Sequence, residues 1–544
     1  MEVSNLLLPA TNRFASDYLQ QSDDVTAFFH YTYKEPGTYK ERVEELLSRD
    51  FPREQLAGHI ESYMARFQES HETSKSIEKL MRQDSVVVIG GQQAGILTGP
   101  LYTIHKAISV IQLARREEEK LGVPVVPVFW IAGEDHDYQE VNHIYVPTET
   151  TAEKWKFPQK VFGKKMVSDI EIDQELCRSW VSNLIAHFGE TAHTKELVGL
   201  IDESLEKFPA FTDFFASIIL HLFRDSGLLL VDSGNKELRQ IESGKFEALI
   251  KSHAAISECL SIQQEAIRKK GFPNAIETTK HSANLFYYEP RLTERVLLEY
   301  DPGRELFTGK NGAVSFTQDE LLQIAREEPH KLSNNVVTRP LMQEWLFPVL
   351  AFIGGPGEIA YWAELKLVFE HFGMKMPPLV PRLNMTILER PVETDLKELQ
   401  LNIAETLRRG TMEEEEKFLK SLENPELEEA FKKAKKEIIG QYENLLEKTA
   451  ASVPSLLPIL KKNEMIVLSQ VGFLEKKLED AARLKHAVTL NKFARVNLAL
   501  RPEGIPQERV LNILYYLNKY GIDFVSRLLN LEYEFDGSHK LIRI

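Results

Sequence analysis

Cysteine is scarce in this sequence: Cys177 and Cys259 are the two in 544 residues, and they lie far apart. Their separation matches no metal-binding spacing, and both fall in stretches with a helical pattern. We therefore expect small buried side chains in a reducing compartment. Residues 1–10 also lack the basic segment of a secretory signal. These features predict a cytoplasmic protein.

Positive charge and long apolar runs are also in short supply. The chain has 66 Lys and Arg against 81 Asp and Glu, which gives a formal net charge of −15. Proteins whose main partner is nucleic acid neutralise phosphates with basic side chains, so we expect no nucleic-acid partner. No apolar run reaches the ~18 residues that a membrane-spanning helix needs, so we expect no membrane partner.

The chain is longer than one hydrophobic core usually supports, about 300 residues, so we expect several domains. Short β-branched runs recur, each followed by glycines or acidic residues and then by a helical pattern. This alternation predicts an α/β fold, a Rossmann-like doubly wound parallel sheet with its ligand crevice at the carboxyl ends of the strands. The runs are 85–91, 124–131, 227–232 and 348–353, with helical patterns that include 101–121, 236–270 and 358–372. We assign residues 1–140, 200–274 and 340–386 to this core.

Other segments follow different patterns. Residues 141–199 and 275–339 are rich in aromatics and short alternating runs, and we expect them to be insertions that cap the crevice. Residues 387–500 carry narrow apolar stripes between charged runs, which is typical of helices paired along one seam. We predict an α-helical antiparallel coiled-coil domain that offers a homodimer surface. Residues 501–544 are expected to pack back on the core.

The turn after the first strand lacks the spacings of the Walker and dinucleotide fingerprints. It leads into a helix whose N-terminal N–H groups suit a phosphate or carboxylate. Thr98 to Lys106 is similar to the HIGH signature of class I nucleotidylyl-transfer folds, with Tyr102 and His105 at the histidine positions. Ile104 replaces the usual glycine, and the alternative is a solvent-exposed histidine at a helix start. A KMSKS-like loop, which usually completes that activation, is not visible.

The second strand ends in Gly133-Glu-Asp-His-Asp-Tyr138, with three carboxylates and an imidazole in four consecutive positions. Adjacent like charges are unfavourable unless a cation, a proton or a substrate amine is present. The cluster could bind an ammonium group or act as acid and base, hold a divalent metal together with His143, or simply cap a turn. We predict no metal, and a metal-dependent hydrolase that uses this cluster stays an alternative function.

A third group of residues follows the strand at 348–353. Gly354-Gly-Pro-Gly357 allows a ligand to approach the backbone closely, and Glu358 and Tyr361 come next on the following helix. Glu358 could instead only compensate the helix dipole. Upstream, Arg339 is a candidate clamp for a carboxylate.

These motifs together resemble one family, the cysteine ligases of bacillithiol biosynthesis (BshC). The resemblance spans nearly the whole chain. It implies a Rossmann-type core with connecting-peptide insertions, a coiled-coil domain and a homodimer. It also implies a ligase that joins L-cysteine to the amine of glucosaminyl-malate, with ATP as the suspected driver because amide formation from a free carboxylate is uphill. The matching segments are 8–13, 90–106, 130–137, 333–340 and 354–362.

We therefore expect a catalytic group, a substrate-binding group and a second nucleotide site. His105 and Lys106 would stabilise charge on a phosphate or acyl oxygen, and Asp135, His136 and Asp137 would hold an ammonium or deprotonate the amine. The substrate-binding candidates are Gln92, Gln93, Thr98, Gly99, Tyr102, Glu134, Arg339, Gly355, Glu358 and Tyr361. The second nucleotide site would comprise Asn384, Met385, Thr386, Asn491 and Lys492. A coiled-coil scaffold with an inactive core is the other alternative function.

Overall fold

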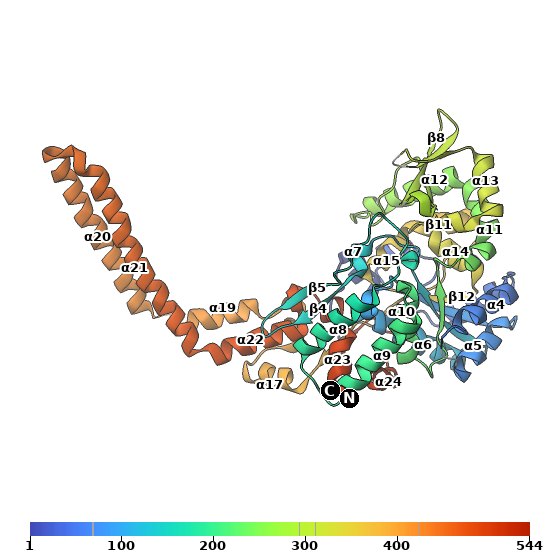
Figure 1. The fold of residues 1–544 in the computed structure, drawn as a ribbon, viewed down its shortest axis with the longest axis horizontal. Helices are drawn as coiled ribbons and strands as arrows, with labels where there is room; N and C mark the ends of the chain where they lie inside the picture. The colour runs from blue at the N-terminus through green and yellow to red at the C-terminus, as the bar shows by residue number, and fades with distance from the viewer. Residues whose placement is uncertain (68–69, 293, 310–311, 423) are drawn as a thin grey trace. The chain divides into compact units, whose positions relative to one another are not determined.

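The computed structural model describes residues 1–67, 70–292, 294–309, 312–422 and 424–544 (Figure 1). The chain forms two compact units, and each is described by itself. Unit 1 comprises residues 1–147, 152–387 and 506–544, and unit 2 comprises residues 148–151 and 388–505. In the described part of the chain, every helix is too short or too polar to cross a bilayer.

A parallel sheet lies at the centre of unit 1, with the strand order β13-β12-β2-β3-β6. Its strands are β2 (Val86–Gln92), β3 (Val125–Ile131), β6 (Leu229–Asp232), β12 (Val349–Gly354) and β13 (Leu379–Pro381). All residues of β3 and β6 are buried. Strands covered on both faces need continuous apolar runs, which is why they were recognisable in the sequence. The predicted α/β fold with a parallel sheet is confirmed.

Helix α6 (Tyr102–Leu121) packs along β2 and β3. The approach is close, because a Cβ on Gly90 would lie 2.9 Å from Val110 Cγ2. Further helices of unit 1 are α1 (Arg13–Leu19), α2 (Asp23–Thr26), α3 (Thr38–Leu47), α4 (Arg53–Met64), α5 (His71–Met81), α10 (Phe211–Leu222), α11 (Lys236–Lys251), α12 (His253–Lys269), α14 (Thr338–Leu346), α15 (Pro356–Trp362) and α16 (Lys366–His371).

The two predicted insertion segments contain both β and α structure. The first holds the short helix α7 (Tyr138–Val141), the hairpin β4 (His143–Pro147) and β5 (Ala152–Lys156), and the helices α8 (Gln174–Phe188) and α9 (Thr194–Lys207). The second forms an antiparallel sheet in the order β10-β9-β8-β7-β11. Its elements are β7 (Ser282–Tyr288), β8 (Arg295–Asp301), β9 (Leu306–Gly309), β10 (Ser315–Phe316), α13 (Gln318–Glu327) and β11 (Leu332–Asn334).

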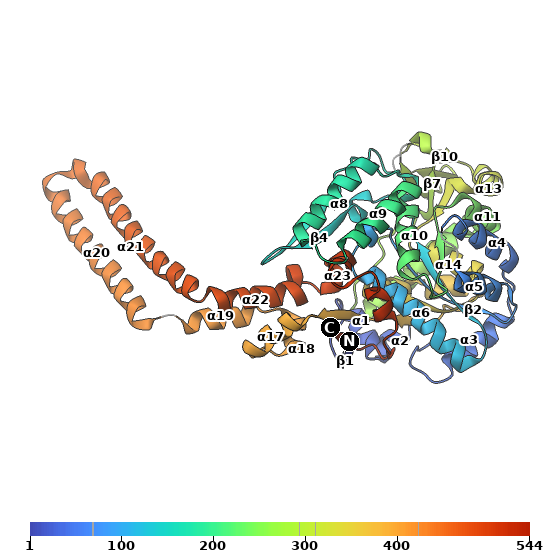
Figure 2. The same ribbon diagram turned by 60° about the horizontal axis from the view of Figure 1, so that its bottom comes forward.

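The C-terminal residues 506–544 belong to unit 1. They contain α23 (Ile513–Tyr520), α24 (Phe524–Leu529) and β15 (His539–Arg543). In a small sheet, β15 lies between β1 (Glu2–Leu6) and β14 (Met385–Leu388), so the two chain ends lie close together (Figure 2). The Gln507 side chain accepts a hydrogen bond from Ile387 N at 2.8 Å and donates one to Ile387 O at 2.9 Å. This pairing fixes the segment that continues into Glu508 and Arg509.

Unit 2 is helical, as its narrow apolar stripes predict. Its helices are α17 (Arg390–Glu398), α18 (Ile403–Arg409), α19 (Met412–Ser421), α20 (Pro425–Ser452), α21 (Leu457–Lys485) and α22 (Ala487–Leu500). Helices α20 and α21 run side by side in opposite directions (Figures 1 and 2). The Tyr442 hydroxyl donates to Asn463 Oδ1 at 2.5 Å, and Lys435 forms an ion pair with Glu475 across the same interface.

Candidate active site

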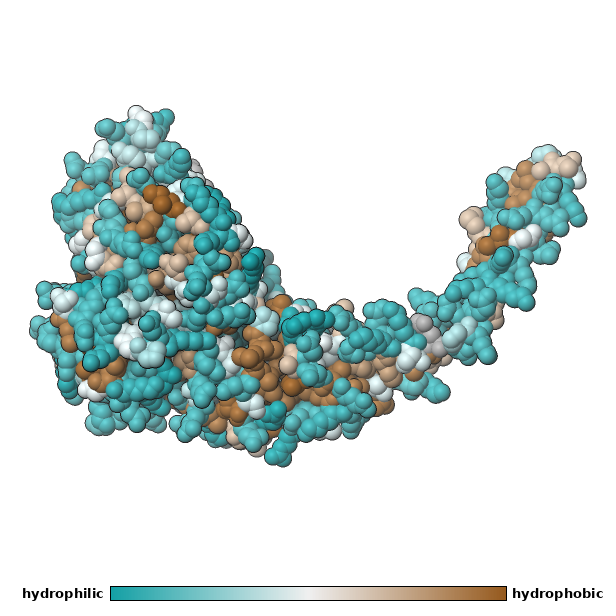
Figure 3. Space-filling view, turned by 180° about the vertical axis from the view of Figure 1, so that it is seen from behind, coloured by the Kyte–Doolittle hydropathy of each residue, from teal (hydrophilic) through white to brown (hydrophobic). Residues whose placement is uncertain are grey.

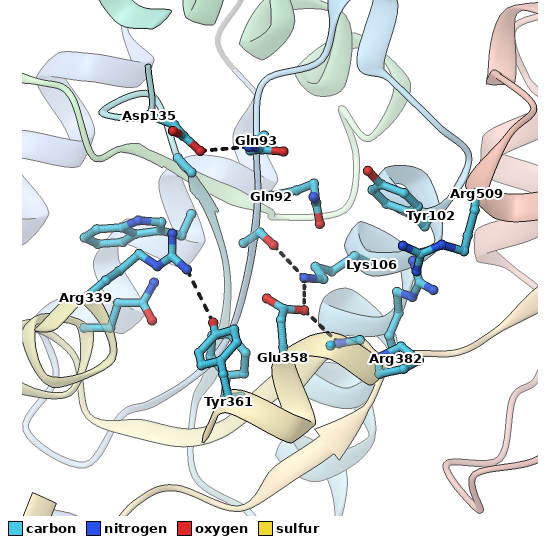
Figure 4. A pocket seen from close by; sticks show the side chains of 18 residues that line it. Gln92, Gln93, Tyr102, Lys106, Asp135, Arg339, Glu358, Tyr361, Arg382 and Arg509 are labelled. Carbon is cyan, nitrogen blue, oxygen red and sulfur yellow. Dashed lines mark hydrogen bonds and ion pairs between the residues drawn. The ribbon is translucent and has the colours of Figure 1, made fainter. Parts of the chain in front are cut away.

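A cavity of about 320 Å³ lies at the carboxyl ends of the parallel strands, where open α/β sheets bind ligands (Figure 4). Its walls come from the ends of β2, β3, β12 and β13, from α6, α14 and α15, and from the C-terminal segment. The lining residues are Gly91, Gln92, Gln93, Tyr102, Lys106, Trp130, Ala132, Asp135, Arg339, Gln343, Phe352, Gly355, Pro356, Gly357, Glu358, Tyr361, Arg382 and Arg509.

Lys106 and Glu358 form a buried ion pair in this cavity. Lys106 Nζ lies 2.5 Å from Glu358 Oε2 and also donates to Gly91 O at 2.6 Å. Burial lowers the pKa of Lys106, and the Glu358 carboxylate opposes that shift. Glu358 Oε2 accepts a further hydrogen bond from Gly355 N at 2.7 Å. The side chain of Glu358 therefore caps the start of α15, and Lys106 is held as a fixed N–H donor.

Asp135 supplies a carboxylate at the part of the cavity lined by the end of β3. Its Oδ2 accepts a hydrogen bond from Gln93 Nε2 at 2.7 Å, and its Oδ1 accepts one from His136 N at 2.7 Å. Burial raises the pKa of Asp135, but Gln93 and the positive charge of Arg295 outweigh burial and lower it. Asp135 is therefore ionised at neutral pH and suited to bind an ammonium group.

The turn that carries Asp135 is held by two backbone hydrogen bonds from residues 167–168. Gly133 O accepts a hydrogen bond from Ser168 N at 3.0 Å, and Asp135 O accepts one from Val167 N at 2.7 Å. A Cβ on Gly133 would lie 2.1 Å from Asp232 Oδ1 and 2.3 Å from Ser168 Oγ. Any larger residue at this position would displace the side chains of Asp232 and Ser168, so Gly133 serves the close packing of the turn.

Three arginines bring positive charge to the cavity. Arg339 Nη2 donates to the Tyr361 hydroxyl at 3.3 Å, and burial raises the pKa of that hydroxyl. The guanidinium carbons of Arg382 and Arg509 lie 5.3 Å and 6.0 Å from the centre of the Tyr102 ring. Among the described lining residues, cationic side chains therefore outnumber carboxylates in a chain of net charge −15. Such a cavity favours anionic substrates.

Several substrate-binding candidates lie together in the cavity lining. They are Gln92, Gln93, Tyr102, Arg339, Gly355, Glu358 and Tyr361. The catalytic candidates Lys106 and Asp135 join them. Arg382 and Arg509 also line the cavity, and neither was predicted as a site residue. Arg382 follows strand β13 and lies two residues before the candidate Asn384, whereas no motif surrounds Arg509.

His105 does not line the cavity, contrary to the role expected for it. Its side chain is fully buried, and Nδ1 lies 3.1 Å from Glu508 Oε2. Burial lowers the pKa of His105. Successive residues of an α-helix point about 100° apart, so Lys106 can face the cavity while His105 faces the interior. His105 is a buried partner of Glu508.

The start of α6 is covered by the C-terminal segment. Leu101 N donates to Leu511 O at 2.8 Å, and Asn512 Nδ2 donates to Leu97 O and to Gly99 O at 2.9 Å and 2.6 Å. Thr98 is fully buried beside this contact, and neither Thr98 nor Gly99 lines the cavity. The expected anion site at these two residues is therefore replaced by contacts within the protein.

The acidic cluster after β3 separates in space. Glu134 is 2% exposed and forms an ion pair with Arg239, with a further hydrogen bond from Asn334 N at 3.2 Å. His136 lies outside the cavity lining, its ring centre 5.8 Å from that of Phe286. Asp137 caps α7 by accepting a hydrogen bond from Gln139 N at 3.2 Å. In the residues that the structure describes, no group of three or more His, Cys, Asp or Glu could hold a metal ion.

The residues expected to form a second nucleotide site are divided between the two units. In unit 1, Asn384 Oδ1 accepts a hydrogen bond from Arg382 Nη2 at 3.1 Å, and Met385 and Thr386 are buried in β14. In unit 2, Asn491 and Lys492 lie on α22, where Lys492 forms an ion pair with Glu398.

The sequence matches two domain families. Residues 1–383 match the family described as "Bacillithiol biosynthesis BshC, N-terminal Rossmann-like domain", and residues 385–544 match the corresponding C-terminal coiled-coil domain. The resemblance found in the motifs is thereby confirmed.

Three similar relatives carry the name "Putative cysteine ligase BshC", and the alignment covers 100% of both chains in each case. The proteins from Geobacillus sp. (strain WCH70), Geobacillus thermodenitrificans (strain NG80-2) and Bacillus cereus (strain AH187) are 45%, 44% and 42% identical to this chain over 544 residues. A match of this extent shows that the chain belongs to the BshC family.

Proposed function

We propose that this chain is a ligase that joins the carboxyl group of L-cysteine to the amine of glucosaminyl-malate and so forms bacillithiol. Membership of the BshC family, with relatives named as cysteine ligases, supports this proposal. The observation that carries it is the single cavity lining that combines an ionised Asp135 with an excess of cationic side chains. That combination suits an amine and carboxylates bound together.

Different lining residues have different roles in the proposed amide formation. The sugar amine attacks the activated carboxyl carbon of cysteine, the carbon–nitrogen bond forms, and the activating group leaves with its oxygen. Asp135 binds the amine in its ammonium form. One proton leaves to solvent and exposes the lone pair, and Asp135 takes the second proton, which the nitrogen loses as the amide forms. General base catalysis of this kind contributes about 10²–10⁴ in rate.

Lys106 stabilises the negative charge that develops on the acyl oxygen. Its ammonium group is already held by Gly91 O and Glu358, so little reorganisation is needed during the reaction. Arg339 is the second cation suited to the cysteine carboxylate, because its guanidinium has Tyr361 as its only side-chain hydrogen-bond partner in the described part of the chain.

Amide formation from a free carboxylate and an amine is uphill in water, so we propose that ATP supplies the driving force. Lys106 and Arg339 are the residues that would hold the phosphate next to the cysteine carboxyl group, since both present N–H donors to the cavity. When bound, ATP converts the carboxylate into a species with a good leaving group.

We also propose that unit 2 supports a homodimer. Large apolar side chains are exposed on α21 and at the start of α22. Figure 3 shows separate hydrophobic areas on the mostly hydrophilic surface of the long helical pair of unit 2. They include Ile459 (63% exposed), Met465 (64%), Phe473 (54%), Leu474 (56%), Leu484 (77%) and Val488 (72%). Large exposed apolar side chains on a helical pair are typical of interaction sites. Light scattering on the wild type and on a Phe473→Glu, Leu474→Glu double variant tests this; a dimer that survives in the variant contradicts it.

The direct test of the enzymatic proposal uses purified protein with cysteine and glucosaminyl-malate, with and without ATP, and follows products by mass. We expect bacillithiol only when ATP is present. Absence of bacillithiol with ATP contradicts the ligase proposal, and equal formation without ATP contradicts the activation proposal alone.

A further inference from the structure

Two guanidinium groups lie over one aromatic ring in the cavity. The guanidinium carbons of Arg382 and Arg509 are 5.3 Å and 6.0 Å from the centre of the Tyr102 ring, and all three side chains line the cavity (Figure 4). A cation over an aromatic face is favourable, but two like charges at the same ring repel each other. Stacking alone therefore does not explain the pair.

Arg382 is anchored and only partly satisfied. It is 5% exposed, and its Nη2 donates to Glu508 Oε1 at 2.5 Å and to Asn384 Oδ1 at 3.1 Å. Neither Nη1 nor Nε donates to an acceptor among the residues that the structure describes. The guanidinium is thus fixed at Nη2, and Nη1 keeps its N–H donors for a ligand.

Glu508 fixes this geometry from inside the fold. It is 5% exposed and also accepts a hydrogen bond from Met385 N at 3.2 Å. Burial raises the pKa of Glu508, but Arg382 and His105 outweigh it and bring the value to about 2. Glu508 is therefore an anion that balances the charge of Arg382.

No carboxylate forms an ion pair with Arg509 among the residues that the structure describes. Its side chain is exposed and forms no ion pair or hydrogen bond with the described residues. The nearby lining carboxylates are already engaged, Glu358 with Lys106 and Asp135 with Gln93. A net positive charge with free donors therefore remains beside Tyr102.

We propose that Arg382 and Arg509 form a subsite for a carboxylate of the malyl group of glucosaminyl-malate, with Glu508 as the positioning residue for Arg382. This inference rests on the proposed function. Guanidinium groups bind carboxylates with paired N–H donors. In Figure 4, Asp135 and Arg509 lie at opposite sides of the cavity. Glucosaminyl-malate carries its amine on the sugar and its carboxylates on the malyl group, so its two ends match the two ends of the cavity.

The same donors could hold another anion, the phosphate of ATP. Glu358 already occupies the N–H group at Gly355, so the glycine-rich turn there does not draw a phosphate towards this part of the lining. Separate measurements of KM for glucosaminyl-malate and for ATP distinguish the two anions.

The primary variant is Arg509→Gln, which removes an exposed, unpaired charge and should leave the fold intact. Hydrogen bonds to charged groups contribute about 1.5–3 kcal/mol, so we expect KM for glucosaminyl-malate to rise about tenfold or more. KM for ATP and for cysteine, and kcat, should stay within about twofold. Arg527→Gln is the matched control, because Arg527 lies in the same C-terminal segment and outside the cavity lining.

An acceptor without the malyl group sharpens the test. With the methyl glycoside of glucosamine, wild type and Arg509→Gln should have the same kcat/KM. A deficit that persists with this acceptor, an unchanged KM for glucosaminyl-malate, or a rise in KM for ATP in its place would each overturn the subsite.

Glu508→Asp tests the positioning role, since it keeps the negative charge and shortens its reach to Arg382. We expect a raised KM for glucosaminyl-malate with kcat retained, and no effect with the methyl glycoside. Glu344→Asp is the control, because Glu344 is also buried and is paired with Arg42 and Arg49 outside the lining. If Glu508→Asp does not fold, Arg382→Gln carries the same comparison.

Calorimetry with glucosaminyl-malate distinguishes failure of the subsite from failure of the proposed function. If glucosaminyl-malate does not bind to the wild type, the proposed function fails too. If the wild type and Arg509→Gln bind it equally well, only the subsite is ruled out.

Discussion

The turn after β3 and the C-terminal segment contribute to the cavity in opposite ways. The turn places three carboxylates close together in the sequence, yet Asp135 is the one that lines the cavity. The C-terminal segment carries no recognisable motif, yet it supplies Arg509 to the lining and Glu508 beneath it. Closeness in sequence thus overstates the functional role of a cluster, and residues brought in by tertiary packing are missed.

The strongest test of this comparison separates two neighbouring carboxylates. Asp135→Asn should lower the rate of bacillithiol formation at least ~100-fold, since it removes the only turn carboxylate that can receive the proton of the amine. Asp137→Asn should stay within about twofold of the wild type, because an asparagine still caps α7. Initial rates by mass spectrometry, with circular dichroism as a check on folding, decide this. Equal losses in both variants would contradict the separation of the cluster.

A second pair lies on one helix. Lys106→Met should lower kcat about 100-fold, the usual effect of removing one donor to a developing oxyanion. His105→Gln should mainly lower the melting temperature, because His105 contacts Glu508 and not the cavity. Both variants are assayed for kcat and thermal unfolding. A larger loss of kcat in His105→Gln than in Lys106→Met would reverse these assignments.

The two regions should also differ in how pH affects stability. Burial raises the pKa of Asp232, which packs against the turn, to about 6. Folding therefore favours its protonated form, and its contribution to stability falls as pH rises from about 4 to 6. The pKa of Glu508 is about 2, so its contribution is present above about pH 4.5 and is lost as pH falls towards 2.

Urea unfolding across this range checks the two signs. Asp232→Asn should remove part of the loss of stability between pH 4 and 6. It should leave the loss of stability below about pH 4 unchanged. Glu508→Gln should reduce only the loss of unfolding free energy between about pH 4.5 and pH 2. If Asp232→Asn leaves the slope between pH 4 and 6 unchanged, the raised pKa of Asp232 does not govern stability there.

The smallest expected effect concerns two glycines. Gly133→Ala places a methyl group against Asp232 and Ser168 and should cost about 1–3 kcal/mol of stability. Gly244→Ala, in α11 with nothing within 4 Å of the added Cβ, should instead stabilise by about 0.5–1 kcal/mol. Denaturant titration measures both. A neutral Gly133→Ala would mean that the turn adapts easily.

The sequence predicted β2, β3, β6 and β12, because each is a largely buried apolar run, but it missed the three-residue strand β13. It was less accurate for helices. The pattern over 236–270 predicts one helix, but the chain breaks at Ser252 between α11 and α12. The pattern over 358–372 likewise divides into α15 and α16, because residues 363–365 form a 3₁₀ turn. Local patterns do not encode where packing interrupts a helix.

Part of the candidate site was predicted because it follows directly from the predicted strands. Lys106 and Asp135 stand in motifs at strand ends, and the topology of the sheet brings those ends together. The choice between His105 and Lys106 was not predictable, since α6 is buried on most of its surface and its apolar residues do not mark one exposed face. Arg382 and Arg509 meet only through the packing of the C-terminal segment.

The most direct test of the central claim is a crystal structure of the protein with glucosaminyl-malate bound. We predict that the ligand occupies the cavity, with its amine at Asp135 and its malyl carboxylates at Arg382 and Arg509. A ligand bound outside this cavity, or bound in it with the two ends exchanged, would contradict the account.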